Sequence, residues 1–360
     1  MTTFASDPRA RTTFRGRLRD RAWQVAAAAT HPRDPADYLD MFRPLRAGAD
    51  LRARVVEVRP ENCNAVTVVL RPGNAWRGHR PGQYVRIGLE VDGVRLWRSY
   101  SLTSAPGDGL ITITAKAVPD GVVSAHLAQD LRPGQLVHLD QAVGDFVLPD
   151  PAPAKILFVT GGSGITPVMG MLRAGLGRFE DAVLVHSEAN ADAVLFGDEL
   201  RDYAAAGHLR LVEQHTDTQG RLDVAALADV VPDLAERETW ACGPAGLLDA
   251  LEEQWSGVLH TERFRTPLVE PGEGGSVTFS ATGTTVELDG ATPILDAGEQ
   301  NGVLMPSGCR MGICFSCVLP LRSGAVRDLR TGEVTTAAPG DGVLVQTCIS
   351  AAAGACDIDC

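Results

Sequence analysis

The chain has 360 residues, more than one hydrophobic core usually supports, so we expect two or three domains. Hydrophobic residues make up 44% and charged residues 22%, a balance that excludes wholesale disorder. The net charge of −12 disfavours nucleic-acid binding, because phosphate contacts require clustered positive charge. There is no apolar run near the roughly 18 residues of a membrane span and no recognisable signal peptide, so we expect a protein that does not span a membrane.

The first segment, residues 1–50, carries nine arginines and six aspartates. Residues 22–30 are predicted to be helical, and the proline-rich stretch after them is predicted to be an irregular connection. We interpret residues 1–50 as an N-terminal helical extension.

From residue 51 the sequence changes to short β-rich runs separated by turns, such as ARVVEVRP, AVTVVLRPG and LITITAKAV. Runs this short and evenly spaced, without helical segments between them, predict an antiparallel β-barrel over residues 51–152.

Strands and helices then alternate over residues 153–262, with helices expected near residues 198–205 and 224–230. This alternation predicts an α/β domain whose parallel sheet is covered on both faces. The proline- and glycine-rich residues 263–274 are predicted to be a linker.

The last domain is expected over residues 275–360, beginning with a hairpin and a short helix near residues 294–300. Six of the eight cysteines lie in the last 52 residues: Cys309, Cys314, Cys317, Cys348, Cys356 and Cys360. A secreted disulfide protein would distribute cysteine pairs through its domains, whereas clustering at one end indicates a metal or redox site in the reducing cytoplasm.

Four cysteines have the spacing C-x4-C-x2-C…C: Cys309, Cys314, Cys317 and, after thirty intervening residues, Cys348. Plant-type [2Fe–2S] clusters are bound by thiolates with this spacing. The alternative, a structural zinc site, favours two C-x2-C pairs, and this sequence has one. Residues 272–360 resemble a plant-type ferredoxin domain, which implies an α+β (β-grasp) fold. Cys356 and Cys360 match no ligand position in it and are expected to be spare thiols.

Two motifs in the barrel region have features that a flavin requires. In the strand Arg98-Ser99-Tyr100-Ser101, alternation places Arg98 and Tyr100 on one face, where they could offer a cation and a flat ring. A glycine-led turn into a predicted helix follows at Gly121, Val122, Val123 and Ser124. Its first N–H groups could hold a pyrophosphate, although an ordinary serine-capped helix is the alternative.

A glycine-rich turn between a predicted strand and helix indicates nucleotide binding; it contains Thr160, Gly161, Gly162, Gly164 and Thr166. Thr166 is expected to be the N-cap of that helix, and glycines let a pyrophosphate approach backbone N–H groups. After a later strand comes Cys242-Gly243-Pro244. Taken separately, the turn could be a plain strand–helix connection and Cys242 a buried small residue.

Together these motifs resemble the ferredoxin–NADP reductase family, in which a flavin barrel precedes a nucleotide domain. The resemblance implies that Arg98 contacts the flavin phosphate, Tyr100 packs on the isoalloxazine and Ser101 lies near its N5 atom. It also implies that the backbone of residues 121–124 holds the pyrophosphate and that Cys242, with Gly243 and Pro244, lies near the nicotinamide. Ser101 and Cys242 are therefore the expected catalytic residues.

The coenzyme is expected to be NADH rather than NADPH. Family members that prefer NADPH often have an arginine after the second strand of the nucleotide domain, and here Ala189 occupies that position. The Glu188 carboxylate could accept hydrogen bonds from ribose hydroxyls and would repel a 2′-phosphate. Arg221 could still provide a cation for NADPH.

The order of domains resembles that of reductase components of multicomponent oxygenases and desaturases. A nicotinamide gives up a hydride, a [2Fe–2S] cluster carries one electron, and a flavin exchanges electrons with both. We therefore expect NAD(P)H, a flavin (FAD rather than FMN) and a cluster to act in series. The final acceptor would be an oxygenase, a desaturase or a cytochrome P450. The alternatives are a flavin/iron–sulfur redox sensor or regulatory module, and a diaphorase whose cluster passes nothing on.

Overall fold

The structure is a computed structural model that describes residues 30, 35–62, 64–91, 93–107, 109–117, 121–175, 177–264, 272–308, 310, 312 and 315–360. Except for Thr30, the helix expected over residues 22–30 lies outside the described residues. The expected irregular connection after it is wrong in part, because Pro35–Phe42 forms helix α2. Pro35 is compatible with this start, since the first helical residue needs no intrahelical N–H bond. Among the described residues, no helix is long and apolar enough to cross a bilayer.

The first domain is a six-stranded antiparallel sheet whose order is β4-β3-β6-β1-β2-β5. Its strands are β1 (Arg52–Asn62), β2 (Ala65–Pro72), β3 (Tyr84–Val91), β4 (Val94–Ser101), β5 (Ile111–Lys116) and β6 (Leu136–Leu139). A bridge between Leu102 and Ile113 joins the two ends of this order. The sheet therefore closes on itself, as the predicted barrel requires, and helix α3 (Val122–Gln129) packs against it.

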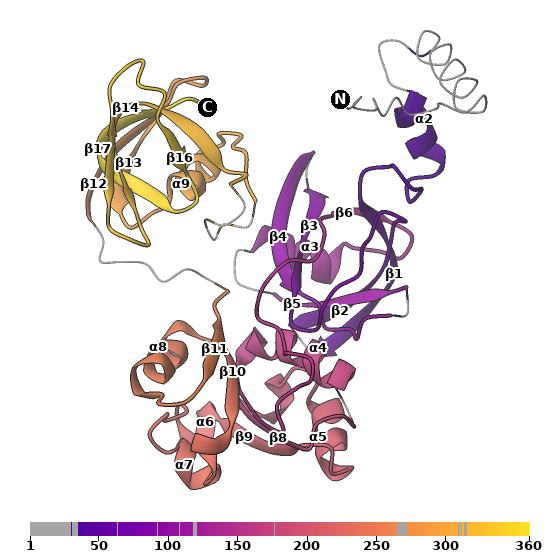
Figure 1. The fold of residues 1–360 in the computed structure, drawn as a ribbon. Helices are drawn as coiled ribbons and strands as arrows, with labels where there is room; N and C mark the ends of the chain where they lie inside the picture. Colours follow the sequence, from indigo (N-terminus) through magenta and orange to yellow (C-terminus); the bar gives the residue numbers. More distant parts are fainter. Residues whose placement is uncertain are drawn as a thin grey trace, which may run out of the picture.

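The second domain is a five-stranded parallel sheet with the order β11-β10-β7-β8-β9. In Figure 1 this domain lies below the barrel domain. Its strands are β7 (Lys155–Gly161), β8 (Asp181–Glu188), β9 (Arg210–His215), β10 (Glu238–Cys242) and β11 (Leu259–Glu262). Its helices are α4 (Ile165–Gly175), α5 (Gly197–Ala205), α6 (Thr216–Gln219), α7 (Leu227–Val230) and α8 (Ala245–Gln254), besides short 3-10 turns.

Helix α7 is shorter than the helix predicted over residues 224–230. The Asp223 side chain accepts a hydrogen bond from the Ala225 N–H, 3.0 Å away, and this local turn delays the start of the helix.

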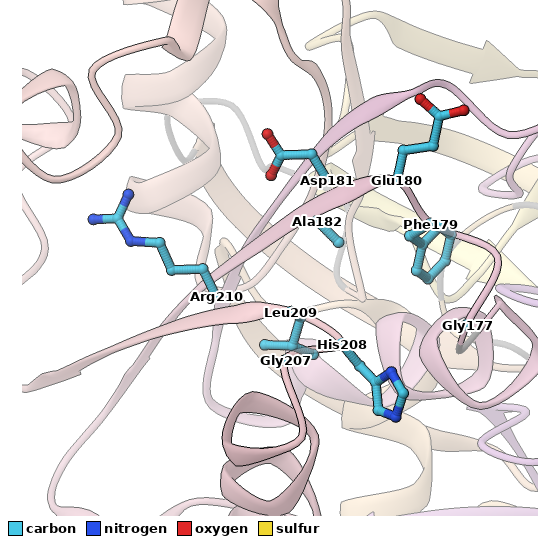
Figure 2. A pocket seen from close by; sticks show the side chains of 9 residues that line it. All are labelled: Gly177, Phe179, Glu180, Asp181, Ala182, Gly207, His208, Leu209 and Arg210. Carbon is cyan, nitrogen blue, oxygen red and sulfur yellow. The ribbon is translucent and has the colours of Figure 1, made fainter.

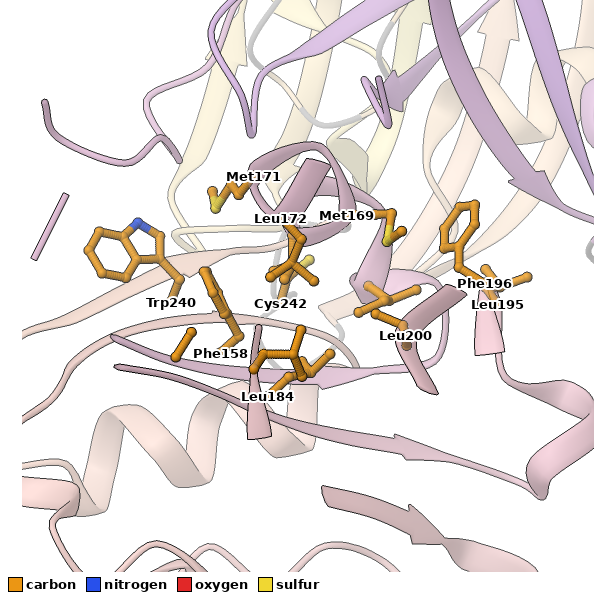
Figure 3. Close-up of a cluster of buried hydrophobic side chains, with 14 of the residues drawn as sticks. Phe158, Met169, Met171, Leu172, Leu184, Leu195, Phe196, Leu200, Trp240 and Cys242 are labelled. Atoms are coloured by element: carbon orange, nitrogen blue, oxygen red, sulfur yellow. The ribbon is translucent and has the colours of Figure 1, made fainter. Parts of the chain in front are cut away.

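Alternation along β7 explains why both faces of this sheet are covered. Ile156 and Phe158 point into a core shared with α4, whereas Leu157 and Val159 point into a core shared with α8. Figure 3 shows the first of these cores, in which the Phe158 ring lies near the Trp240 ring, with 6.4 Å between their centroids. A strand buried on both faces is the expected environment in a parallel sheet.

The third domain is a mixed sheet with the order β13-β12-β17-β14-β15, and β16 pairs with β14 beside it. Its strands are β12 (Gly272–Phe279), β13 (Thr284–Gly290), β14 (Val318–Asp328), β15 (Val334–Ala337), β16 (Leu344–Gln346) and β17 (Ser350–Ile358). Helix α9 (Ile294–Gln300) lies where it was predicted and buries Ile294 and Leu295. Together with the barrel and the parallel sheet, this domain confirms the predicted three-part architecture.

Replacing Phe158 by alanine should destabilise the parallel-sheet domain by about 3–5 kcal/mol, because its fully buried ring would leave a cavity between β7 and α4. Denaturant unfolding followed by circular dichroism measures this loss. Phe42→Ala is the matched control: its ring is 84% exposed, so the expected change stays within about 0.5 kcal/mol. Equal losses in the two variants would contradict the described core.

Candidate electron-transfer site

The flavin motif lies on β4, which pairs antiparallel with β3. Tyr100 packs against the barrel core, and burial raises the pKa of its hydroxyl above the usual range, so the ring stays neutral. Ser101, the next residue, is buried. The Arg98 guanidinium is largely desolvated and donates to the Trp97 carbonyl oxygen at 2.7 Å. The predicted motif residues thus all lie on β4.

The glycine-led turn begins helix α3, as predicted, and this helix contacts β4. Its N-cap is Gly121, which has no side chain with which to cap the helix. Ser124 does not cap it either, because its hydroxyl donates to the Gly121 carbonyl oxygen at 3.0 Å. The serine-capped helix considered above is therefore not what forms. A first turn that begins without a side-chain cap leaves N–H groups that fit a pyrophosphate.

The nucleotide turn is a 3-10 turn at Gly162–Gly164 between β7 and α4. The expected N-cap role of Thr166 is wrong, because α4 already begins at Ile165. The Thr166 hydroxyl instead donates to the Ser163 carbonyl oxygen, 2.9 Å away. Since the 3-10 turn supplies the first turn of backbone, no threonine cap is needed there.

The two nucleotide motifs, about eighty residues apart in sequence, are in contact. Cys242 ends β10 and pairs with Thr160 at the end of β7. A Cβ atom on Gly164 would lie 2.1 Å from the Cys242 carbonyl oxygen, which only glycine tolerates. A Cβ atom on Gly161 would lie 2.7 Å from the Pro244 ring. The glycines therefore serve this close packing, and both loops lie at the carboxyl edge of the sheet, where such domains bind ligands.

Sequence reasoning missed Glu262, which ends β11 beside Cys242. Burial raises the pKa of its carboxyl group to about 8 and also raises that of the Cys242 thiol well above its usual value. In the described part of the chain, one Glu262 carboxylate oxygen is buried without a hydrogen-bond partner. Its place at the end of a parallel strand could have indicated Glu262 as a site residue, because the carboxyl ends of such strands form the ligand-binding edge of the sheet.

Glu188 ends β8, close to Gly162, and is bonded to the barrel. Its carboxylate accepts from the Lys116 ammonium at 2.9 Å and from the Ala189 N–H at 3.0 Å. Lys116, which ends β5, was not among the predicted site residues. Arg221 is exposed in the segment after β9. The predicted coenzyme carboxylate thus already has a cationic neighbour from another domain.

Two of the four predicted cluster ligands are described, and both are buried: Cys317 is 1% exposed and Cys348 is 6% exposed. Cys309 and Cys314 lie outside the described residues. Thr347 links the two described ligand segments, since its hydroxyl and its N–H both donate to the Cys317 carbonyl oxygen, at 2.9 and 3.2 Å. Buried thiols on two segments that are tied together in this way fit two of the four thiolates that a [2Fe–2S] cluster requires.

Between Cys309 and Cys317, which we call the cluster loop, several described residues have a left-handed backbone. Arg310, Gly312 and Phe315 have φ values of 58°, 74° and 56°, in the left-handed region. The Gly312 carbonyl oxygen accepts from the Gln346 amide at 2.9 Å, which ties the loop to β16. Cys356 lies on β17 and is buried, and Cys360 follows that strand.

A separate hollow lies at the opposite edge of the parallel sheet (Figure 2). It is lined by Phe179 to Ala182 before and at the start of β8 and by residues 207–210 before and at the start of β9. Because the nucleotide motifs lie at the carboxyl ends of the strands, this hollow is not part of the candidate site.

Comparison with known proteins identifies all three domains. Models of the oxidoreductase FAD-binding domain, the oxidoreductase NAD-binding domain and the 2Fe-2S iron-sulfur cluster binding domain match residues 61–148, 158–253 and 277–353. An NADPH oxidoreductase of Mycobacterium tuberculosis is 46% identical over 368 aligned positions, covering 97% of this chain and 96% of the relative. A glycine betaine monooxygenase reductase subunit of Pseudomonas aeruginosa is 30% identical, covering 75% and 84%.

The fold is also that of a solved structure, phthalate dioxygenase reductase. The two superpose with a TM-score of 0.59 at 22% identity, covering 86% of this chain and 97% of the other.

The chain belongs to the ferredoxin–NADP reductase family of flavoproteins that carry a C-terminal [2Fe–2S] domain. It is an NAD(P)H-dependent oxidoreductase that binds FAD and a [2Fe–2S] cluster, and electrons pass from NAD(P)H through FAD to the cluster. FAD is therefore the flavin, as predicted.

Glu262 should make stability depend on pH. Because its folded pKa of about 8 exceeds the unfolded value near 4.3, the folded state holds an extra proton between these pH values. The free energy of unfolding should therefore fall as pH rises through this window, by up to about 1.4 kcal/mol per pH unit. Glu262→Gln should flatten the curve between pH 5 and 8.

Denaturant unfolding at several pH values measures this dependence. Glu253→Gln, at an exposed position on α8, is the control and should leave the wild-type slope unchanged. Parallel curves for wild type and Glu262→Gln would show that Glu262 ionises normally.

Proposed function

We propose that this chain is a reductase component that delivers single electrons from its cluster to a protein acceptor, namely an oxygenase, a desaturase or a cytochrome P450. The observation that carries the proposal is the contact between the cluster loop and the flavin barrel, where the Arg86 guanidinium donates to the Ser316 hydroxyl at 2.9 Å. A loop held against the electron donor on one side is suited to take electrons from it. The monooxygenase reductase subunit that is 30% identical supports the acceptor class.

The barrel residues are proposed to bind and orient the flavin. Arg98 would hold a phosphate group, Tyr100 would offer its neutral ring to the isoalloxazine, and Ser101 would lie near the N5 atom. The N–H groups of residues 121–124 would hold the pyrophosphate at the start of α3. When bound, FAD exchanges two electrons with a nicotinamide and single electrons with a cluster.

The nucleotide-domain residues are proposed to place the coenzyme against that flavin. Residues Thr160 to Gly164 would accept the pyrophosphate, while Cys242, Gly243 and Pro244 would border the nicotinamide. Cys242 is buried and its thiol stays protonated, so it can pack against the ring without adding charge. Glu262 lies beside Cys242 and is mostly protonated at neutral pH. It would therefore place no negative charge close to the flavin, which accepts the hydride.

A reducing compartment, the cytoplasm, is proposed for the protein. Cys242, Cys356 and Cys360 form no disulfide among the described residues. Thiols kept reduced in this way are usual in the cytoplasm and unusual in secreted proteins.

Replacing Cys314 by serine separates this function from its alternatives. The variant should keep NAD(P)H-driven reduction of ferricyanide, which takes electrons from the flavin, and lose most reduction of cytochrome c. Steady-state rates with both acceptors measure the split, and Cys360→Ser, which alters no predicted ligand, is the control. Equal survival of the two activities would favour a diaphorase. A cluster that is reduced but passes no electrons to any protein acceptor would favour a redox sensor.

NADH should give a higher kcat/KM than NADPH, because Ala189 replaces the arginine that often binds a 2′-phosphate and Glu188 lies next to it. Glu188→Ala frees the Lys116 ammonium, so it should raise the NADPH/NADH ratio of kcat/KM about tenfold, equivalent to about 1.4 kcal/mol. The name of the mycobacterial relative makes NADPH the rival outcome. A tenfold preference of the wild type for NADPH would refute the Glu188 argument.

A further inference from the structure

A hydrogen bond joins the barrel to the cluster loop next to a cluster ligand. Arg86, on β3, donates from Nη1 to the Ser316 hydroxyl oxygen at 2.9 Å. Ser316 directly precedes Cys317, and the Arg86 side chain is largely buried, with 23% of it exposed. This contact spans 230 residues of sequence, so the two groups meet only because the domains are docked.

The barrel holds the Arg86 side chain in a fixed orientation. Its Nε and Nη2 atoms both lie 2.5 Å from the same Asp140 carboxylate oxygen, just after β6. The Asp140 N–H in turn donates to the Arg86 carbonyl oxygen at 3.0 Å. On the neighbouring strand, the Trp97 ring lies 5.5 Å from the guanidinium carbon and adds a cation–π contact. These partners hold the guanidinium while its Nη1 atom reaches Ser316.

The ferredoxin domain also has charged residues that act on the barrel electrostatically. Asp296 and Glu299 of α9 both pair with Arg310 of the cluster loop. This cluster of charges is within electrostatic range of Arg98 on β4. The two carboxylates attract the Arg98 guanidinium and the Arg310 cation repels it, so charges of both signs act across this domain boundary.

We propose that Arg86 is a positioning residue for electron transfer from flavin to cluster: through Ser316 it docks the cluster loop on the barrel, and Asp140 and Trp97 keep it aimed. The step it serves moves one electron, so that the flavin side is oxidised, the cluster is reduced and no covalent bond changes. Because transfer between centres slows steeply with their separation, loosening this contact slows that step and leaves hydride transfer from the coenzyme unaffected.

Anaerobic stopped-flow spectroscopy of the holoprotein tests the proposal, because it resolves flavin reduction from cluster reduction. Arg86→Gln should keep the rate of flavin reduction within about twofold and slow cluster reduction at least about tenfold, equivalent to about 1.4 kcal/mol in the barrier. Arg95→Gln is the matched control. Arg95 is an exposed arginine on β4 of the same hairpin, and it pairs with Glu90 within that hairpin. It should change neither rate.

Ser316→Ala tests the contact from its other side, also if Arg86→Gln folds poorly. It should slow cluster reduction in the same way, and in the Arg86→Gln background it should add little, since both changes remove one hydrogen bond. Hydrogen–deuterium exchange provides a readout that is independent of activity. Amides in residues 84–101 and 315–318 should exchange faster in Arg86→Gln and Ser316→Ala than in wild type or Arg95→Gln.

Two results would overturn the inference. Cluster reduction in Arg86→Gln at the wild-type rate would show that the contact does not position the loop. A parallel fall of flavin reduction and cluster reduction would show that Arg86 only supports the barrel. The proposed electron-transfer function fails by a different result, namely a wild-type cluster that neither coenzyme reduces.

Discussion

A nicotinamide gives up two electrons together, whereas a [2Fe–2S] cluster accepts one, so the flavin must exchange electrons with both. This requirement determines which domains must be in contact. The barrel has to contact the nucleotide domain on one side and the ferredoxin domain on another. Lys116 and Glu188 form an ion pair across the first boundary, and Arg86 and Ser316 form a hydrogen bond across the second. Both contacts lie beside residues expected to hold a cofactor. Each boundary that the electron path crosses thus has at least one interdomain bond close to it.

The two boundaries are built differently. The nucleotide domain contacts the barrel through helix α4. A Cβ atom on Gly170 would lie 2.3 Å from the Leu102 carbonyl oxygen, and Arg173 donates to the Thr103 carbonyl oxygen at 2.7 Å. Such backbone contact leaves little freedom of movement. The contact with the ferredoxin domain rests on side-chain charges and one hydroxyl. Polar contacts of this kind are weaker in salt and allow a tethered domain to detach, which suits a module that must also meet a partner protein.

The sequence predicted those features that depend on local spacing. The glycine turn at Thr160 and the helix after Gly121 each follow from residues within about ten positions of one another, and the four cluster ligands remain a prediction from spacing. The sheet architecture followed from period and alternation. These errors were local as well: the 3-10 turn at Gly162–Gly164 lets α4 begin at Ile165, and a bond of the Asp223 side chain delays the start of α7.

What the sequence did not reveal depends on contacts between distant segments. Glu262 has no motif around it, and its perturbed pKa arises from burial at a sheet edge that only the folded domain creates. Lys116 and Arg86 are ordinary strand residues until another domain is placed against them. For these residues the informative quantity is the relative position of domains, which no periodicity within one domain encodes.

The most direct measurement is an anaerobic reductive titration of the purified holoprotein, with metal and flavin analysis and quantitation of electron spins. The account predicts two iron atoms and one FAD per chain, and close to one spin per chain from the cluster once reduced coenzyme is in excess. A protein that holds zinc, or one whose iron stays oxidised while its flavin is fully reduced, would contradict it.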